Sequence, residues 1–244
     1  MLIGRNLEEV GQLKWTAKYD RKLDGYSEAI GMLRNVTHRE ELPLVLLQPE
    51  HWKGDTVIWL EGSGKACLYA DSPDGRPKPE VCRLLDQGLA VIGVDLIYQG
   101  EFLAYGVAME KTRSVDNRFA APAYTFGYNS SVFAQRVHDI LTVVKFVQTR
   151  DDKAAKLLVM GLNGAGPLVA AAVPQARGAI NGAVIATSGF RFGQLLDVHD
   201  ANFLPGGAKY GDLPGMIALA GPTRIIQIDA TEKAPASALQ ELLR

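Results

Sequence analysis

The stretch KLLVMGLNGAGPLVAAAV, residues 156–173, decides the fold of this chain. It begins as an apolar run typical of a buried strand, turns at a cluster of glycines, and continues as small and apolar residues typical of a helix. A tight turn of this kind lifts one side chain above the sheet, and here that side chain is Asn163. The sequence therefore predicts a strand–turn–helix unit with an amide at its apex.

The segments on both sides of this unit alternate between strand and helix. Apolar runs typical of strands in a parallel sheet occupy residues 55–60, 89–96, 181–188 and 223–229, and helical patterns occupy residues 80–87 and 131–150. Two β-rich runs between residues 25 and 50 flank a polar turn, which indicates an antiparallel hairpin. We expect a single α/β domain over residues 1–244, with a doubly wound, mostly parallel sheet and an N-terminal hairpin.

Two segments fall outside this alternation. Residues 1–24 are expected to form an N-terminal extension. Residues 97–129 are rich in aromatic side chains and longer than most connections, so we expect a long loop that covers the cleft.

Composition narrows the function. The 26 Lys and Arg against 27 Asp and Glu give a net charge of -1, which predicts no nucleic-acid partner. No apolar run reaches the roughly 20 residues of a membrane span, and no signal peptide is recognisable, so the chain is expected to be soluble, either cytoplasmic or secreted with its signal removed. Cys67 and Cys82 are too few for a disulfide framework or a zinc site. We expect no metal and no cofactor.

Two interpretations compete for the glycine turn at residues 161–166. A phosphate-binding loop would place glycines in the pattern G-x-G-x-x-G and an acidic residue after the next strand, whereas that strand ends in Thr187 and Ser188. A nucleophile elbow has the pattern G-x-S-x-G. Gly161 and Ala165 fit its two small flanking positions, with Asn163 in place of the serine.

With the elbow in place, the chain from about Gly25 onward resembles the α/β-hydrolase superfamily, especially its acetyl xylan esterase and dienelactone hydrolase branch. The resemblance rests on the hairpin, the elbow and four further segments: EGSGK (61–65) at the oxyanion position, VDLIYQGEF (94–102), RVHDIL (136–141) and YGDLPGMIALAGP (210–222). It implies an α/β-hydrolase fold and, if the chain is active, a carboxylic-ester hydrolase.

The chain departs from this family at the catalytic positions. Asn163 has no proton that a base could remove to make a nucleophile. The family's histidine follows an eighth strand, and too few residues follow the last expected strand to form one. We therefore expect a sheet without the usual last strand and a degenerate triad. Asp229 and Glu232 match the zone of the family's acid, and without a histidine partner they are expected to cap or solvate the final helix.

Among the four histidines, His199 is the one expected in a loop on the catalytic rim. Asp197 and Asp200 flank it and could orient its imidazole toward a water near Asn163, although the same residues also fit a polar surface loop. The other histidines are expected to be solvated or structural (His38, His51 and His138). No catalytic residue is assigned, and these side chains stay candidates.

The ligand-binding candidates line the expected crevice: Glu61, Gly62, Ser63, Asn163 and Gly164. A carboxylate at the oxyanion position opposes anion stabilisation unless it is turned away. Three functions remain open. The favoured one is an esterase-like pseudoenzyme that binds a small molecule or carbohydrate. The others are an active esterase of acetylated carbohydrate with a variant site, and an interaction scaffold or homo-oligomer that pairs through the sheet edge left by the missing strand.

Overall fold

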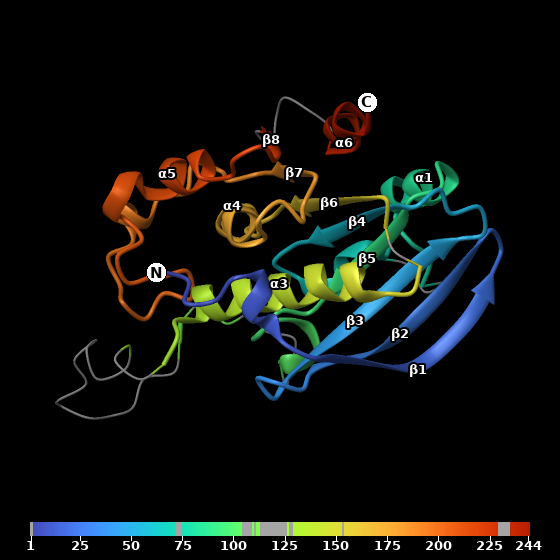
Figure 1. The fold of residues 1–244 in the computed structure, drawn as a ribbon, viewed down its shortest axis with the longest axis horizontal. Coiled ribbons are helices and arrows are strands. Elements are labelled where there is room, and N and C mark those ends of the chain that lie inside the picture. The colour runs from blue at the N-terminus through green and yellow to red at the C-terminus, as the bar shows by residue number, and fades with distance from the viewer. Residues whose placement is uncertain are drawn as a thin grey trace.

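One mixed sheet organises the chain in the computed structural model, which describes residues 2–71, 75–103, 109, 111–112, 126, 129–152, 154–228 and 235–244. Within these residues the sheet has eight strands in the order β1-β2-β3-β5-β4-β6-β7-β8 (Figure 1). The strands are β1 (Leu13–Leu23), β2 (Tyr26–Asn35), β3 (Glu40–Pro49), β4 (Asp55–Leu60), β5 (Ala90–Val94), β6 (Lys156–Gly161), β7 (Gly182–Ile185) and β8 (Arg224–Gln227). The α-helices are α1 (Pro79–Asp86), α3 (Val132–Thr149), α4 (Gly166–Gln175), α5 (Asp212–Ala218) and α6 (Pro235–Leu243).

The pairing of the strands confirms the predicted fold class. Strands β5, β4, β6, β7 and β8 are parallel, while β2 and β3 form an antiparallel hairpin that joins them through β3 and β5. Among the described residues β8 is the last strand and forms one edge of the sheet. The sequence therefore predicted the mostly parallel sheet and its N-terminal hairpin; the expected lack of the usual last strand stays a prediction.

The opposite edge of the sheet differs from expectation. Residues 1–24, expected as an extension, contain the short 3-10 helix η1 (Leu7–Val10) and the eleven-residue strand β1, which pairs antiparallel with β2. The side chains of β1 are almost all exposed and many are charged. Since the strand has solvent on both faces for most of its length, it lacks the apolar alternation that signals a strand.

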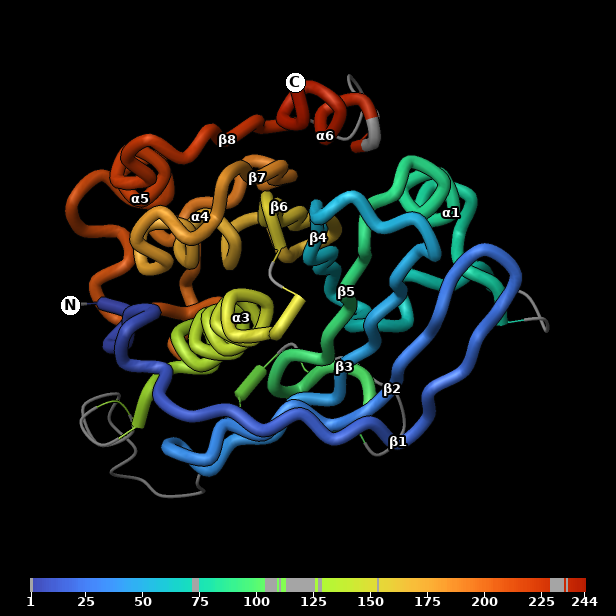
Figure 2. Tube along the Cα trace, turned by 45° about the vertical axis from the view of Figure 1, so that its right-hand side comes forward, coloured from blue at the N-terminus to red at the C-terminus, as the bar shows by residue number. Residues whose placement is uncertain are grey.

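Helices cover both faces of the sheet (Figure 2). One core lies between the sheet and the face covered by α3 and α4, and includes Ile58 and Leu60 of β4. The other lies under α1 and α6 and includes Val57 and Trp59 of the same strand. Because alternate side chains of each strand enter opposite cores, the parallel strands are buried on both faces and read as continuous apolar runs.

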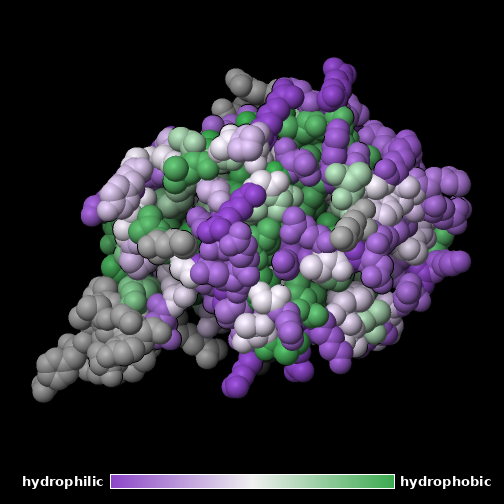
Figure 3. Space-filling view, in the orientation of Figure 1, coloured by the Kyte–Doolittle hydropathy of each residue, from purple (hydrophilic) through white to green (hydrophobic). Residues whose placement is uncertain are grey.

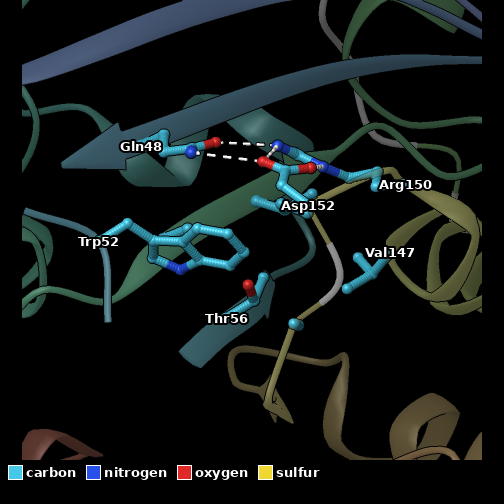
Figure 4. A pocket seen from close by; sticks show the side chains of 9 residues that line it. Gln48, Trp52, Thr56, Val147, Arg150 and Asp152 are labelled. Carbon is cyan, nitrogen blue, oxygen red and sulfur yellow. Dashed lines mark hydrogen bonds and ion pairs between the residues drawn. The ribbon is translucent and has the colours of Figure 1, made fainter. Parts of the chain in front are cut away.

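A small cavity lies at the amino ends of the parallel strands, on the rim opposite to the elbow. It has a volume of about 10 Å³, beside Trp52 and Thr56. In Figure 4 Gln48 bridges Arg150 and Asp152 above it. This space is close to that of a single water molecule, so the cavity is a packing feature rather than a ligand site.

Helix α3 buries three ionisable side chains next to one another. The Asp139 carboxylate accepts a hydrogen bond from the Ile97 backbone at 2.8 Å, and the Arg136 guanidinium donates to the Ile97 carbonyl at 3.1 Å. His138 donates from Nε2 to the Ile3 carbonyl at 2.6 Å, while its Nδ1 has no partner among the described residues. These bonds tie the loop after β5 and the N-terminal segment to α3. His138 is structural, in agreement with expectation.

Burial raises the pKa of the Asp139 carboxyl to about 7. The folded protein therefore holds a proton that the unfolded chain releases near pH 4, and the stability from this group is lost as the pH rises through about 7. Urea unfolding measures the free energy of unfolding of the unaltered protein and of Asp139→Asn. We expect the unaltered protein to exceed the variant by more at about pH 5 than at about pH 8.5. An equal difference at both values would contradict a buried, protonating Asp139.

His138 supplies a control of opposite sign. Burial lowers the pKa of its imidazole, so the stability from this group is lost as the pH falls below about 6.5. The free energy of unfolding of the unaltered protein should therefore exceed that of His138→Gln by less at about pH 5 than at about pH 8.5.

Candidate functional site

The predicted elbow lies between β6 and α4. Asn163 has φ 44° and Gly164 has φ 92°, so two successive residues adopt the left-handed conformation that a sharp strand-to-helix turn requires. Asparagine tolerates this conformation better than most residues do. A Cβ on Gly161 would lie 2.6 Å from Cγ2 of Val169, and one on Gly166 would lie 2.1 Å from the Ala186 carbonyl oxygen. The strand–turn–helix unit is thus confirmed, and the sequence had not pointed to Gly166 as a close contact.

The side chain of Asn163 is bonded to Glu61, which follows β4. Nδ2 of Asn163 donates to Oε2 of Glu61 at 2.6 Å, and Nε1 of Trp59 donates to Oε1 at 2.9 Å. The ammonium of Lys78 is 3.6 Å from Oε1. Glu61 is only 7% exposed. The carboxylate is therefore buried against the elbow rather than turned away from it.

The backbone of the same loop is also bonded to the elbow. The N–H of Gly62 donates to the Asn163 carbonyl at 3.0 Å, and the N–H of Gly64 donates to the Glu61 carbonyl at 3.1 Å. A Cβ on Gly62 would approach that Asn163 oxygen to 2.9 Å. In an oxyanion loop such N–H groups face the developing negative charge. Here the Gly62 donor is already used within the protein.

A buried ion pair between Lys65 and Asp95 connects the loop after β4 to the end of β5. This pair was not predicted from the sequence. Asp95 is fully buried; it accepts hydrogen bonds from the backbone N–H groups of Lys65, at 2.8 Å, and Glu101, at 3.0 Å, and it pairs with the Lys65 ammonium. Lys65 also contacts the exposed Glu101 carboxylate at 2.6 Å. The available signal was an aspartate placed directly after a continuous apolar strand.

The carboxylates beside His199 bond to backbone rather than to its imidazole. Asp197 accepts from the His199 N–H at 2.9 Å and pairs with Lys111 at 2.9 Å, and Asp200 accepts from the Asn202 N–H at 2.7 Å. The bond to the His199 N–H and the Lys111 ammonium lower the pKa of Asp197. Within the described part of the chain the His199 ring has no hydrogen bond. Its role stays a prediction.

Other predicted features lie partly or wholly outside the described residues. Asp229 and Glu232 are among them, as is most of the long loop at residues 97–129. Of that loop, Lys111 forms a β-bridge with Asp200, and the ring of Phe126 packs 5.4 Å from that of Phe203. Covering of the cleft by this loop therefore stays a prediction. Ser63 is exposed next to the Glu61 loop.

Comparisons with known proteins agree on the fold. No protein-family model matches the sequence, and no curated protein matches it. Acetyl xylan esterase 1 from Thermoanaerobacterium sp. JW/SL YS485 is 12% identical, with a TM-score of 0.58 over 99% of this chain and 90% of that one. A promiscuous CE15 esterase from a marine bacterial metagenome is 14% identical, with a TM-score of 0.61 over 95% of this chain and 70% of that one.

At this level of sequence identity, the similarity to these two esterases is a similarity of fold. The chain has an α/β-hydrolase fold like that of the acetyl xylan esterase, which confirms the resemblance inferred from the sequence. No helix within the described ranges combines the length and apolarity needed to cross a bilayer. No group of three or more potential metal-ligating side chains occurs in those ranges either.

Proposed function

We propose that this chain is an esterase-like pseudoenzyme that binds a ligand in the crevice above the elbow without hydrolysing it through a serine-type triad. One observation carries the proposal: the Asn163 amide donates to the buried Glu61 carboxylate at 2.6 Å. Ester hydrolysis needs a nucleophile at the apex and hydrogen-bond donors facing the developing oxyanion. The elbow instead has an amide, Asn163, at the position of the nucleophile and a carboxylate, Glu61, beside the donors expected to face the oxyanion.

The same groups favour a neutral ligand rich in hydroxyl groups. The Glu61 carboxylate carries more acceptor sites than its bonds to Trp59 and Asn163 use, and a carboxylate accepts hydroxyl hydrogen bonds well. The Lys78 ammonium, 3.6 Å from Oε1, balances part of this charge, and the remaining negative charge disfavours an anion. A carbohydrate or another small polyol therefore fits the crevice better than a carboxylic acid does.

Hydrolysis of p-nitrophenyl acetate tests the catalytic half of the proposal. The unaltered protein is expected to match its Asn163→Ala variant and buffer, since neither side chain can be activated as a nucleophile. Asn163→Ser is expected to stay at that level as well, because the Glu61 carboxylate opposes an oxyanion. Turnover by the unaltered protein that disappears in Asn163→Ala would contradict the proposal and favour an active esterase. Turnover by Asn163→Ser alone would show that a base remains within reach.

Ligand binding is tested by saturation-transfer NMR with a xylo-oligosaccharide. Signals that weaken in Glu61→Gln, a change that removes the charge but retains the shape of the side chain, would support the crevice as the site. Signals of equal strength in the variant would contradict it.

Self-association through the sheet edge stays a prediction. Strand β8 has only four residues, so its free edge offers few backbone groups to a partner strand. No further observation favours the scaffold hypothesis over ligand binding.

A further inference from the structure

We propose that a groove formed by α4, α5 and the N-terminal segment binds a small amphipathic carboxylate, such as a medium-chain fatty acid. The groove has a volume of about 430 Å³, within the usual range for small-molecule sites. Its walls are mostly apolar and come from three parts of the chain: Leu2, Ile3, Ala171, Pro174, Met216 and Leu219.

This groove is separate from the elbow. Helix α4 begins at Gly166, beside the elbow, whereas the groove is lined by Ala171, Pro174 and Gln175 from its later turns. With a rise of about 1.5 Å per residue, these positions lie roughly 8 to 14 Å further along the helix axis. The inference therefore does not depend on the function proposed for Asn163.

Large apolar side chains are exposed around the groove. Tyr210 is 76% exposed, Leu219 is 71% exposed and Leu2 is 36% exposed, and all three line it. In Figure 3 hydrophobic surface is visible at the upper left of the molecule, where Figure 1 places α5. Exposed apolar residues that gather around one concave site, rather than being scattered singly, are typical of a binding surface.

The turn before α5 is held in a fixed, strained conformation. Tyr210, Gly211 and Asp212 have φ values of 61°, 91° and 55°, so three successive residues have a positive φ. The Asp212 carboxylate stabilises this turn by accepting hydrogen bonds from the backbone N–H groups of Phe192, Gly193 and Leu213. Strain of this kind persists where surrounding contacts enforce it and is often found at ligand sites. The groove is therefore pre-formed at this end.

One positively charged side chain, Lys209, lines this end of the groove. The Lys209 ammonium lies 4.9 Å from the centroid of the Tyr210 ring, and among the residues that the structure describes it has no ion pair with a carboxylate. The neighbouring Asp212 carboxylate is committed to its three backbone donors. Lys209 and Asp212 are the charged residues that line the groove. Because backbone donors occupy the Asp212 oxygens, the Lys209 ammonium is the group that can pair with a carboxylate on an apolar chain.

Calorimetric titration with decanoate, below its micelle concentration, tests the proposal. One equivalent is expected to bind. Lys209→Glu is expected to weaken decanoate about tenfold, because it removes an attraction and adds a repulsion, while the affinity for the uncharged 1-decanol should change less than about twofold. Leu219→Glu should weaken both ligands, since it places a charge on the apolar wall. Both residues are largely solvent-exposed or at the rim, so the fold should be retained, which circular dichroism would check.

Lys18→Glu is the matched control. Lys18 also lies over the ring of the tyrosine that follows it, 5.4 Å from the Tyr19 centroid, but on β1 and away from the groove. Its variant should bind decanoate as the unaltered protein does. The proposal would be overturned by no binding at millimolar decanoate, or by decanoate binding that Leu219→Glu leaves unchanged. A dimer in sedimentation that Leu219→Glu dissociates would overturn it too, because the occupant would then be a second copy of the chain.

Discussion

Replacing Lys65 with methionine is expected to lower the free energy of unfolding by about 3 to 5 kcal/mol. The substitution retains most of the length of the side chain but removes the ammonium that pairs with the fully buried Asp95. Asp95 would keep its two backbone donors, yet its charge would no longer be balanced. Leaving one partner of a buried pair uncompensated costs far more than the pair itself contributes. Urea unfolding at neutral pH measures the difference.

Two further variants identify the cause. Glu101→Gln removes the other carboxylate on Lys65, which is 60% exposed, and is expected to change the stability by less than about 1 kcal/mol. The double variant Lys65→Met/Asp95→Asn should recover much of the loss, because no buried charge remains. A loss below about 1 kcal/mol in Lys65→Met alone would contradict the interpretation of Lys65 and Asp95 as a buried pair.

Replacing Gly166 with alanine is expected to lower the free energy of unfolding by about 3 kcal/mol. Within a helix, glycine to alanine normally stabilises by up to about 1 kcal/mol, so the predicted effect has the opposite sign. The reason is the close approach of α4 to the chain after β7: the added methyl group would lie 2.1 Å from the Ala186 carbonyl oxygen. Relief of this clash would have to move the start of α4, and the elbow with it.

Gly164→Ala serves as the comparison at the same turn. Gly164 has φ 92° and nothing within 4 Å of an added Cβ, so its substitution should cost only the left-handed backbone penalty of about 1 to 2 kcal/mol. Equal losses in the two variants would contradict the close approach as the cause, since Gly166 does not share this backbone conformation.

The parallel half of the fold was predictable because its strands are buried on both faces. Residues 55–60 coincide with β4, and the apolar run that opens the quoted stretch coincides with β6. Burial on both faces makes such segments recognisable in the sequence, since their positions after the first one or two residues are apolar. Strand β1 has no apolar run that would predict it, because it pairs with β2 at the sheet edge and is exposed along most of its length.

The site was predictable in its backbone and less so in its side chains. The glycines of the elbow predicted a tight turn with Asn163 at its apex. The direction of the Glu61 carboxylate was not predictable, because it depends on donors from different elements: Trp59 in β4, Asn163 after β6 and Lys78 before α1. The groove beside α5 was equally unpredictable, since its walls combine the N-terminal segment with residues of α4 and α5 that lie about 170 to 220 positions later in the chain.

Intact-mass spectrometry after incubation with a fluorophosphonate probe tests the central claim most directly. Such probes label a nucleophile that is activated by a neighbouring base. With an amide at the elbow apex and a buried carboxylate bonded to it, the unaltered protein is expected to keep its unmodified mass. A single stoichiometric adduct on Ser63 or on any other side chain in the crevice would contradict the account, because it would show that the fold still carries an activated nucleophile.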